Sequence, residues 1–482
     1  MDFGIILKVL GLLLLIESAF MIPSLGISMY YGEHDITAFV LSIVITAAVG
    51  LPAFFFFKPK KMESISYKEG FMIVGLGWIL ASAFGALPFM ISGVCDSFID
   101  AYFETVSGFT TTGASIFREV ESLPHGILFW RSFTHWLGGM GILVFTLALL
   151  PTMGASTIQI YKAESPGPSP DKLAPKLGQT AKLLYGVYVI ITVVMVVALF
   201  IAGMPIFDAV THTFGTVGTG GFSVRNLSIG AYQNALYDWI IAFFMFICAI
   251  NFSLHYEILH GNFKALIKDS EFRFYIGIVL TSIILVTINI YPLFDYNLRE
   301  SIRQSAFQVA SVISTTGYAT VDYNTWPDFS RMILLLLMFF GGCAGSTGGG
   351  IKHIRILVIL KMIRRELYKL IHPHAVISIR VGGKPVSEDL LQNIVGFVLL
   401  YLIIFTTASL SLLTQGLDIM SSVSAVVSAL SNIGPGFGLV GPASNYADLT
   451  GISKIILIAC MLIGRLEIYT LIVLFVPTFW KR

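Results

Sequence analysis

Ten long apolar stretches recur along this 482-residue chain and limit the folds open to it. A helix needs roughly 20 mostly apolar residues to cross a membrane, and each stretch reaches that length. Hydrophobic residues make up 56% of the sequence and charged residues 12%, with a mean hydropathy of +0.83. Soluble domains average about 25% charged residues, so the sequence predicts an integral membrane protein. The predicted spans cover residues 3–30, 36–57, 69–92, 125–150, 180–203, 235–259, 272–294, 329–361, 389–413 and 452–477.

Basic residues gather in the connections on one side of these spans. An excess of Lys and Arg marks the cytoplasmic side of a membrane protein. Ten spans place both termini on that same side, so we expect a multi-pass protein of a cell inner membrane with both termini cytoplasmic. The basic residues are Lys58, Lys60 and Lys61, Lys162, Lys172, Lys176 and Lys182 in the 151–187 connection, Lys264, Lys268 and Arg273, the stretch 361–384, and Lys481 and Arg482.

Composition excludes several other classes of protein. A net charge of +2 gives no argument for nucleic-acid binding. The four cysteines are far apart in sequence, and we read neither a disulfide framework nor a metal motif in them. The first apolar run lacks a small-residue cleavage pattern and is interpreted as a retained membrane helix.

Four short segments on the opposite face share one pattern. Each ends in a Gly that follows a small residue by six positions, and most residues between are small or hydroxylated. The segments cover residues 107–113, 215–221, 311–317 and 428–434. A stretch of helix-compatible residues too short to cross the membrane precedes each one, over 98–109, 206–215, 302–313 and 420–429. These stretches fit re-entrant half-helices that return as extended backbone.

The predicted fold is therefore an all-α polytopic membrane protein built from repeats. Four pseudo-repeated units, each a span, a pore helix, a filter loop and a second span, surround one pore, and two extra spans precede them. The expected divisions are residues 1–62 for the two N-terminal spans and 63–160, 161–265, 266–370 and 371–482 for the four pore repeats, the third with a broken last span.

Backbone in these loops suits a dehydrated cation, because carbonyl oxygens replace its water. Non-helical backbone at membrane depth survives only where it is buried in protein or lines a water-filled cavity. The loops carry no ring of carboxylates, which favours a monovalent ion. Ordinary Gly-rich extracellular loops are the alternative. The predicted filter residues are Thr111, Thr112, Gly113, Thr219, Gly220, Gly221, Thr315, Thr316, Gly317, Asn432, Ile433 and Gly434.

The eighth span is interrupted at its centre by ten small residues over 341–350. So many glycines inside a helix are costly, and we interpret the run as a flexible intramembrane gate below the filter. A close-packed crossing of helices at small residues is the alternative. The glycines assigned to the gate are Gly341, Gly345, Gly348, Gly349 and Gly350.

Several charged residues lie inside the predicted spans, where charge is costly and marks function or pairing. Arg465 is interpreted as a positive barrier facing the pore, with an ion pair to Glu467 or another acid as the alternative. Lys352 and Arg355 either pair with acids or reach the cytoplasmic surface.

Other polar residues lie near span ends or in the half-helices. Arg131, His135 and Asp238 are expected at the membrane interface. Glu104 and His212 occupy matching positions in the first two half-helices and are expected to form hydrogen bonds behind the filter.

With these features together, the sequence is similar to the TrkH-type subunit of the Trk/Ktr/HKT potassium-transporter superfamily. The four loops, the break over 341–350 and the segment 464–467 carry this resemblance, which covers essentially the whole chain. It implies a homodimer with one pore per protomer and a cytosolic RCK-type nucleotide-binding regulatory subunit. It also implies filter glycines at Gly113, Gly221, Gly317 and Gly434, a gate at residues 341–350 and a constriction at Arg465. The resemblance further implies a preference for potassium over sodium, because position 113 is Gly rather than Ser.

Two departures from the family pattern concern the filter. Gly220 and Gly221 are consecutive, so the register of the second loop is open to a shift by one. The fourth loop has no Thr beside Gly434, so the filter is not four-fold symmetric.

The expected function is uptake of K⁺ through a gated, carbonyl-lined filter, with K⁺ as transported ion, membrane lipid as surroundings and no bound organic cofactor. Passage of Rb⁺ or Na⁺ is left open. Channel-like flow is favoured over proton or sodium symport, since no acidic relay is obvious between the spans. A secondary transporter of a small solute is the first rival. A membrane-embedded enzyme is the second, but no acid pair accompanies His353, His372 and His374 at ligand spacing.

Overall fold

The structure is a computed structural model that describes residues 1–57, 65–141 and 177–481. The end of the expected span 125–150, most of the 151–187 connection with Lys162, Lys172 and Lys176, the lysines at 58, 60 and 61, and the unit boundaries near 62 and 160 lie outside these residues. Six described helices are long and apolar enough to cross a membrane, or eight if each of two bent pairs is one span. The expected helical membrane fold is confirmed.

Helices account for nearly all the described elements. The α-helices are α1 (Phe3–Phe20), α2 (Ile22–Tyr31), α3 (Ile36–Phe56), α4 (Tyr67–Gly85), α5 (Leu87–Ile91), α6 (Phe98–Phe109), α7 (His125–Gly139), α10 (Leu177–Ile201), α11 (Ile206–Val217), α12 (Ala235–Cys248), α13 (Phe252–Leu259), α14 (Phe263–Lys268), α15 (Ser270–Ile290), α16 (Leu298–Ile313), α17 (Asp328–Phe339), α18 (His353–Ile371), α19 (Glu388–Leu413), α20 (Ile419–Ser431), α21 (Gly451–Arg465), α22 (Tyr469–Ile472) and α23 (Pro477–Trp480). Short 3₁₀ turns lie at Ser228–Tyr232, Tyr291–Phe294, Tyr323–Thr325, Gly438–Val440 and Val473–Phe475, and β1 (Arg380–Val381) pairs antiparallel with β2 (Lys384–Pro385).

The half-helices expected from the sequence are α6, α11, α16 and α20. Polar side chains cap the N-termini of two of them: Asn297 accepts from the Glu300 amide in α16, and Asp418 accepts from the Ser421 amide in α20. Such caps satisfy amides that have no partner within the helix. Each half-helix follows a longer helix and precedes a second helix, which we call the inner helix of its unit. The inner helices are α7, α12, α17 and α21. This is the span, half-helix, loop, span order that the sequence predicts.

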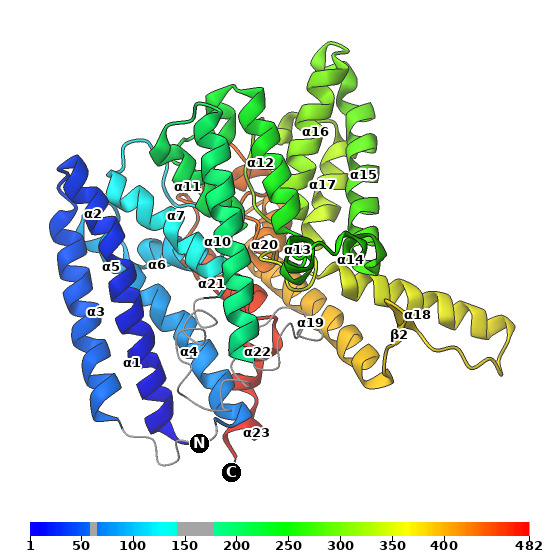
Figure 1. The fold of residues 1–482 in the computed structure, drawn as a ribbon, viewed down its shortest axis with the longest axis horizontal. Helices are drawn as coiled ribbons and strands as arrows, with labels where there is room; N and C mark the ends of the chain where they lie inside the picture. Colours follow the sequence, from blue (N-terminus) through cyan, green and yellow to red (C-terminus); the bar gives the residue numbers. More distant parts are fainter. Residues whose placement is uncertain (58–64, 142–176, 482) are drawn as a thin grey trace.

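Half-helices and inner helices alternate around a closed circuit. Starting from α6, contacts run through α7, α11, α12, α16, α17, α20 and α21, and α21 returns to α6. Segments hundreds of residues apart thereby become neighbours around one axis. Helices α1 and α3 pack against each other beside α4, outside this circuit. Both chain ends lie at the same end of the molecule (Figure 1).

The inner helices of the last three units are broken. Helices α12 and α13 meet at 102°, and α21 and the segment Tyr469–Phe475 meet at 112°. The continuous spans expected over 235–259 and 452–477 are therefore wrong. Between α17 and α18 the chain forms a non-helical loop over residues 340–352, as the small residues there predict. From this loop α18 projects away from the helical body together with the hairpin that follows it (Figure 1).

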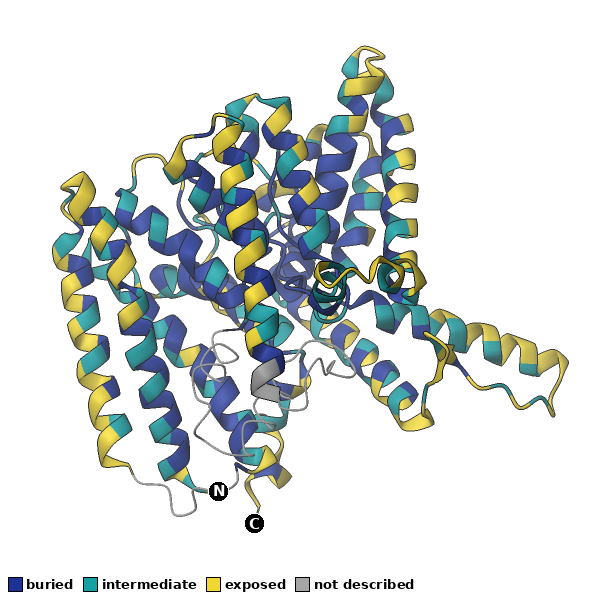
Figure 2. Cartoon of the chain, viewed as in Figure 1, coloured by how far each residue is buried: buried dark blue, intermediate teal, exposed yellow. Residues whose placement is uncertain are grey.

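Burial follows this arrangement. Residues around the central axis are buried, whereas outward faces of α3, α10 and α15 are exposed and apolar (Figure 2). An apolar outward face is what lipid contact requires.

Candidate functional site: a ring of four re-entrant loops

Each half-helix ends in the same hydrogen-bonded turn. The small residue that lies six positions before the final Gly accepts a hydrogen bond at its carbonyl from the amide of the residue just before that Gly. A second hydrogen bond that spans fewer residues, such as the one from the Thr111 amide to the Gly108 carbonyl, lies inside the first. This is a Schellman motif, a common C-terminal cap in which one residue adopts left-handed backbone. The outer bonds are Thr112 to Ser107 (2.8 Å), Gly220 to Gly215 (2.7 Å), Thr316 to Ser311 (2.9 Å) and Ile433 to Ser428 (2.9 Å).

The left-handed residue of this cap is not a glycine in any of the four loops. Thr111, Thr219, Thr315 and Asn432 have φ between 55° and 60°. A non-glycine in this region costs about 1–3 kcal/mol and persists only where surrounding structure enforces it. Asn tolerates the conformation better than Thr, which accounts for Asn432 in the loop that lacks Thr. The four backbones therefore match although their sequences do not.

The final glycines bring the four loops into a closed ring. A Cβ placed on Gly113 would lie 1.9 Å from the carbonyl oxygen of Gly220. A Cβ on Gly221 would lie 1.9 Å from the carbonyl oxygen of Thr316, and one on Gly317 would lie 1.9 Å from that of Ile433. A Cβ on Gly434 would lie 2.6 Å from the carbonyl oxygen of Thr112. Each loop thus packs its Gly on the carbonyl that precedes the Gly of the next loop, and the fourth returns to the first.

The register of the second loop follows from this ring. Gly221 has a φ of 79°, beside 80°, 84° and 103° for the other three final glycines, and it contacts the third loop as they contact their neighbours. Gly220 stands where the other loops have Thr or Ile. The expected alignment therefore holds without a shift.

Side-chain hydrogen bonds fasten two of the loops internally, and one joins the fourth loop to the first. Thr110 and Thr112 hydroxyls lie 2.8 Å apart, and Ser314 and Thr316 hydroxyls 2.7 Å apart. Asn432 donates from Nδ2 to the Thr112 hydroxyl at 3.0 Å and to the Met461 carbonyl at 3.0 Å. The amide side chain thereby links the fourth loop to the first and to its own inner helix.

A buried ion pair supports the first loop from behind. Arg131 Nε lies 2.6 Å from Glu104 Oε1, with the side chains 2% and 0% exposed. Glu104 also accepts from the Ile116 amide at 2.8 Å, and Arg131 donates to the Ser223 carbonyl at 3.1 Å. Glu104 thus forms hydrogen bonds behind the loop as expected, but the interfacial position expected for Arg131 is wrong.

The second loop has a matching support. His212 Nε2 lies 3.0 Å from the Ser223 hydroxyl, and the Tyr318 hydroxyl donates to carbonyls of His212 (3.2 Å) and Phe222 (3.1 Å). Asp238, expected at the interface, is buried at the start of α12 with Arg303 Nε 3.5 Å away. His135, also expected there, is fully buried between the first two loops.

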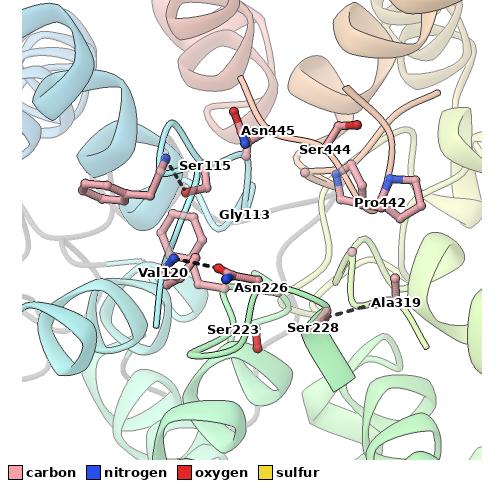
Figure 3. A pocket seen from close by; sticks show the side chains of 18 of the residues that line it. Gly113, Ser115, Val120, Ser223, Asn226, Ser228, Ala319, Pro442, Ser444 and Asn445 are labelled. Atoms are coloured by element: carbon pink, nitrogen blue, oxygen red, sulfur yellow. Dashed lines mark hydrogen bonds between the residues drawn. The ribbon is translucent and has the colours of Figure 1, made fainter. Parts of the chain in front are cut away.

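A cavity of about 160 Å³ lies over the ring and includes all four final glycines in its lining. Figure 3 shows residues from all four units around it. Hydrogen bonds cross between units here: the Val120 amide donates to Asn226 Oδ1 at 2.7 Å, and the Ala319 amide to the Ser228 hydroxyl at 3.2 Å. These bonds fix the mouth of the ring.

The loop over residues 340–352 lies directly against the other side of the ring. The Gly349 amide donates to the Thr315 hydroxyl at 2.8 Å, and a Cβ on Gly349 would lie 2.2 Å from the Ser431 carbonyl oxygen. The two arms of the loop are equally close, because a Cβ on Gly341 would lie 1.6 Å from the Gly349 oxygen. Gly345 and Gly350 have φ of 73° and 66°. A Cβ on Gly348 would lie 3.0 Å from the Ser314 carbonyl oxygen.

These contacts decide between the two interpretations of the small-residue run. Residues 340–352 are not helical, so a helix crossing at small residues is wrong. Only glycine fits where backbone meets backbone this closely.

Basic side chains hold this loop. Arg465, at the end of α21, donates to the Thr347 carbonyl at 2.9 Å and to the carbonyls of Gly138 and Gly139, the latter at 3.0 Å. It therefore joins the loop to the end of α7. The ion pair of Glu467 is with Arg355, and the Lys352 ammonium donates to the Gly348 carbonyl.

Glu271, which the sequence did not single out, is a second anchor of the loop. Its Oε1 accepts from the amides of Ala344 and Ile354, both at 2.9 Å. The loop also fills the break between α12 and α13, where the Cys343 amide donates to the Ala249 carbonyl at 2.8 Å and the Phe252 amide to the Gly345 carbonyl at 2.9 Å. A single acid at the start of a predicted span does not indicate from sequence that it anchors a distant loop. The break between α12 and α13 could have been sought at Asn251, because Asn is a residue type that caps the start of a helix.

Four half-helices, a closed ring of their loops and an intramembrane loop beneath it define a polytopic membrane protein with a pseudo-four-fold central axis. A family model described as a cation transport protein, TrkH, matches residues 35–482. The chain belongs to the TrkH family.

The chain is similar to Trk system proteins over all or nearly all of their length. The chain is 41% identical to the Trk system potassium uptake protein TrkH of Salmonella typhimurium, with all of both chains covered. It is 37% identical to the Trk system potassium uptake protein TrkG of Escherichia coli, over 98% of this chain and 97% of that one. The crystal structure of the potassium transporter TrkH from Vibrio parahaemolyticus superposes with a TM-score of 0.90 at 36% identity, over 100% of each chain.

Proposed function

We propose that this protein takes up potassium across a cell inner membrane, and that the ring of four loops is its selectivity filter. The carbonyls of Thr112, Gly220, Thr316 and Ile433, each packed on the final Gly of the preceding loop, are the observation that carries the proposal. A ring of carbonyl dipoles substitutes for the hydration shell of a monovalent cation. The half-helices add to this, because each directs its partly negative C-terminal end at the ring.

The filter residues expected from the sequence take distinct parts in this proposal. Those that precede each final Gly supply the ring carbonyls. Those in the left-handed position, Thr111, Thr219, Thr315 and Asn432, set the turn that aims the carbonyls. Gly113, Gly221, Gly317 and Gly434 permit the close approach of neighbouring loops.

The gate in this proposal is the loop over residues 340–352. It lies against Thr315 and Ser431 below the ring, and Arg465 crosses from α21 to reach it. Opening requires this loop to leave the axis, which its glycines allow. A guanidinium beside the path raises the energy of a passing cation and limits leak through the closed form.

The protein's partners and orientation belong to the same proposal. We expect both termini in the cytoplasm, a second copy of the chain in a homodimer, and a separate cytosolic RCK-type subunit that carries any nucleotide site. The projecting α18 supports a partner there, since it exposes apolar side chains such as Leu367 (59%) and Ile371 (74%). Flow down the membrane potential is favoured over symport.

Rubidium uptake into liposomes that contain the purified chain tests the filter. We expect uptake that K⁺ competes for and Na⁺ does not. In Gly113→Ser the new Cβ displaces the Gly220 carbonyl, so the preference for K⁺ over Na⁺ should fall about tenfold, the effect of about 1.4 kcal/mol at one ion site. The matched control is Gly277→Ala, where the Cβ meets nothing within 4 Å and selectivity should be unchanged.

Absence of cation flux, also with cytosolic extract added, would contradict the proposal and favour transport of another solute. Flux that requires a proton or sodium gradient would replace channel-like flow by symport.

A further inference from the structure

His135 occupies the seam between the first and second filter loops. It lies on α7, four residues before that helix ends at Gly139, and its side chain is fully buried. The residues that it contacts belong to two different repeats, and neither the ring carbonyls nor the gate described above includes it.

Both ring nitrogens of His135 are used, each by a different repeat. Nδ1 lies 2.8 Å from the Gly108 carbonyl in α6, and Nε2 lies 3.1 Å from the Phe222 amide, directly after Gly221. A carbonyl only accepts and an amide only donates, so Nδ1 carries the hydrogen and Nε2 accepts. The ring also packs on the Phe222 ring, with centroids 4.2 Å apart. The imidazole therefore fixes the second loop to the first half-helix.

The same ring occupies the space that a side chain at position 220 needs. A Cβ on Gly220 would lie 2.3 Å from both Cγ and Nδ1 of His135. The backbone of His135 is equally close to the second loop, since a Cβ on Gly218 would lie 2.4 Å from the His135 carbonyl oxygen. Thr112, Thr316 and Ile433 hold the corresponding positions in the other loops and carry side chains. This contact gives a physical reason for the consecutive glycines of the second loop.

The second loop also lacks a fastening that two other loops have. In the first and third loops a hydroxyl from the helix end meets the Thr that precedes the final Gly, at 2.8 and 2.7 Å. Gly220 has no side chain and cannot form this contact. The Phe222 amide, two residues after Gly220, donates instead to His135. This hydrogen bond holds the second loop through a side chain that lies outside the loop.

We propose that His135 is a positioning residue that determines selectivity, because it sets the Gly220 carbonyl in the ring and requires glycine at that position. The proposal rests on the function proposed above. It assigns ion discrimination in the second repeat to a side chain of the first repeat's inner helix.

Four variants test it: His135→Ala, His135→Gln, Gly220→Thr and the double variant His135→Ala with Gly220→Thr. Selectivity is measured as competition of K⁺ and Na⁺ against rubidium uptake, and folding as the melting temperature in detergent. His260→Ala, at an exposed histidine that bonds only its own helix in the described contacts, is the matched control and should change neither.

In His135→Ala we expect uptake to persist while the preference for K⁺ over Na⁺ falls about tenfold, since a buried amide loses its acceptor and the loop shifts. Gln offers a donor and an acceptor on one amide, so His135→Gln should recover part of the preference. Gly220→Thr alone should lose uptake and melt lower, because the Thr meets the imidazole. The double variant should melt higher than Gly220→Thr and regain uptake.

Unchanged selectivity in His135→Ala would overturn the proposal, and so would a double variant that melts no higher than Gly220→Thr. If the wild-type chain carries no cation, the function itself fails. In that case the melting temperatures of Gly220→Thr and the double variant still show whether the His135 side chain is the reason that position 220 must be glycine.

Discussion

At the scale of single residues, a buried ion pair supports the ring of loops, and an exposed ion pair lies near its mouth. Arg131 and Glu104 form a pair from which water is excluded, whereas Arg118 and Asp448 form a pair at the mouth with side chains 70% and 79% exposed. Loss of one member of a buried pair leaves an uncompensated charge, and the cost is much larger than at the surface.

We therefore predict that Glu104→Ala destabilises the protein by about 3–5 kcal/mol. Asp448→Ala, the matched surface change, should cost less than about 1 kcal/mol. Chemical or thermal unfolding in detergent measures both. Equal effects of the two substitutions would show that the buried pair contributes no more than the exposed one.

Single residues also mark where sequence reasoning succeeded and failed. The spacing of Gly113, Gly221, Gly317 and Gly434 predicted four equivalent loops, because a repeated backbone conformation imposes a repeated glycine. The placement of Arg131 and His135 at the interface was wrong, since their partners, Glu104 and Phe222, become neighbours only through tertiary packing. Position along a helix says nothing about which face meets another repeat.

At the scale of elements, the broken inner helices form one structure with the intramembrane loop. The break between α12 and α13 receives backbone from the loop, and the loop in turn is tethered by Glu271 on α15 and Arg465 on α21. The sequence predicted the break after α17 from its run of small residues. At residues 249–251 the only sign of a break is Asn251, which caps α13. Residues 466–468 carry no run of small residues, and Ile468 there adopts a φ of 59° under the constraint of the surrounding structure.

These tethers predict how flux responds when they are cut. Arg465→Ala and Glu271→Ala should each raise rubidium flux through the chain alone by about tenfold, because each removes charged hydrogen bonds that hold the closed loop. Glu271→Gln keeps an accepting oxygen for the Ala344 and Ile354 amides and should remain near wild type.

Glu119→Ala, at an exposed acid away from the loop, is the control for the acidic substitution. A fall in flux in both alanine variants would mean that the tethers support the open form.

At the scale of the whole molecule, one circuit of alternating half-helices and inner helices closes around a single axis. The sequence predicted the repeated units and their order, because the apolar spans and the glycine spacing are local signals. It did not predict that Asn432 would link the fourth loop to the first, since that bond joins residues 320 positions apart. Pseudo-symmetry thus resides in the backbone, whereas the side chains that hold it differ from loop to loop.

In the function proposed here, the ring carbonyls of Thr112, Gly220, Thr316 and Ile433 bind the transported ion. Anomalous scattering from crystals grown in rubidium locates that ion. We expect rubidium on the axis of the ring, coordinated by these four carbonyls, and its loss in Gly113→Ser. Rubidium bound instead beside carboxylates between the spans, with none at the ring, would contradict it.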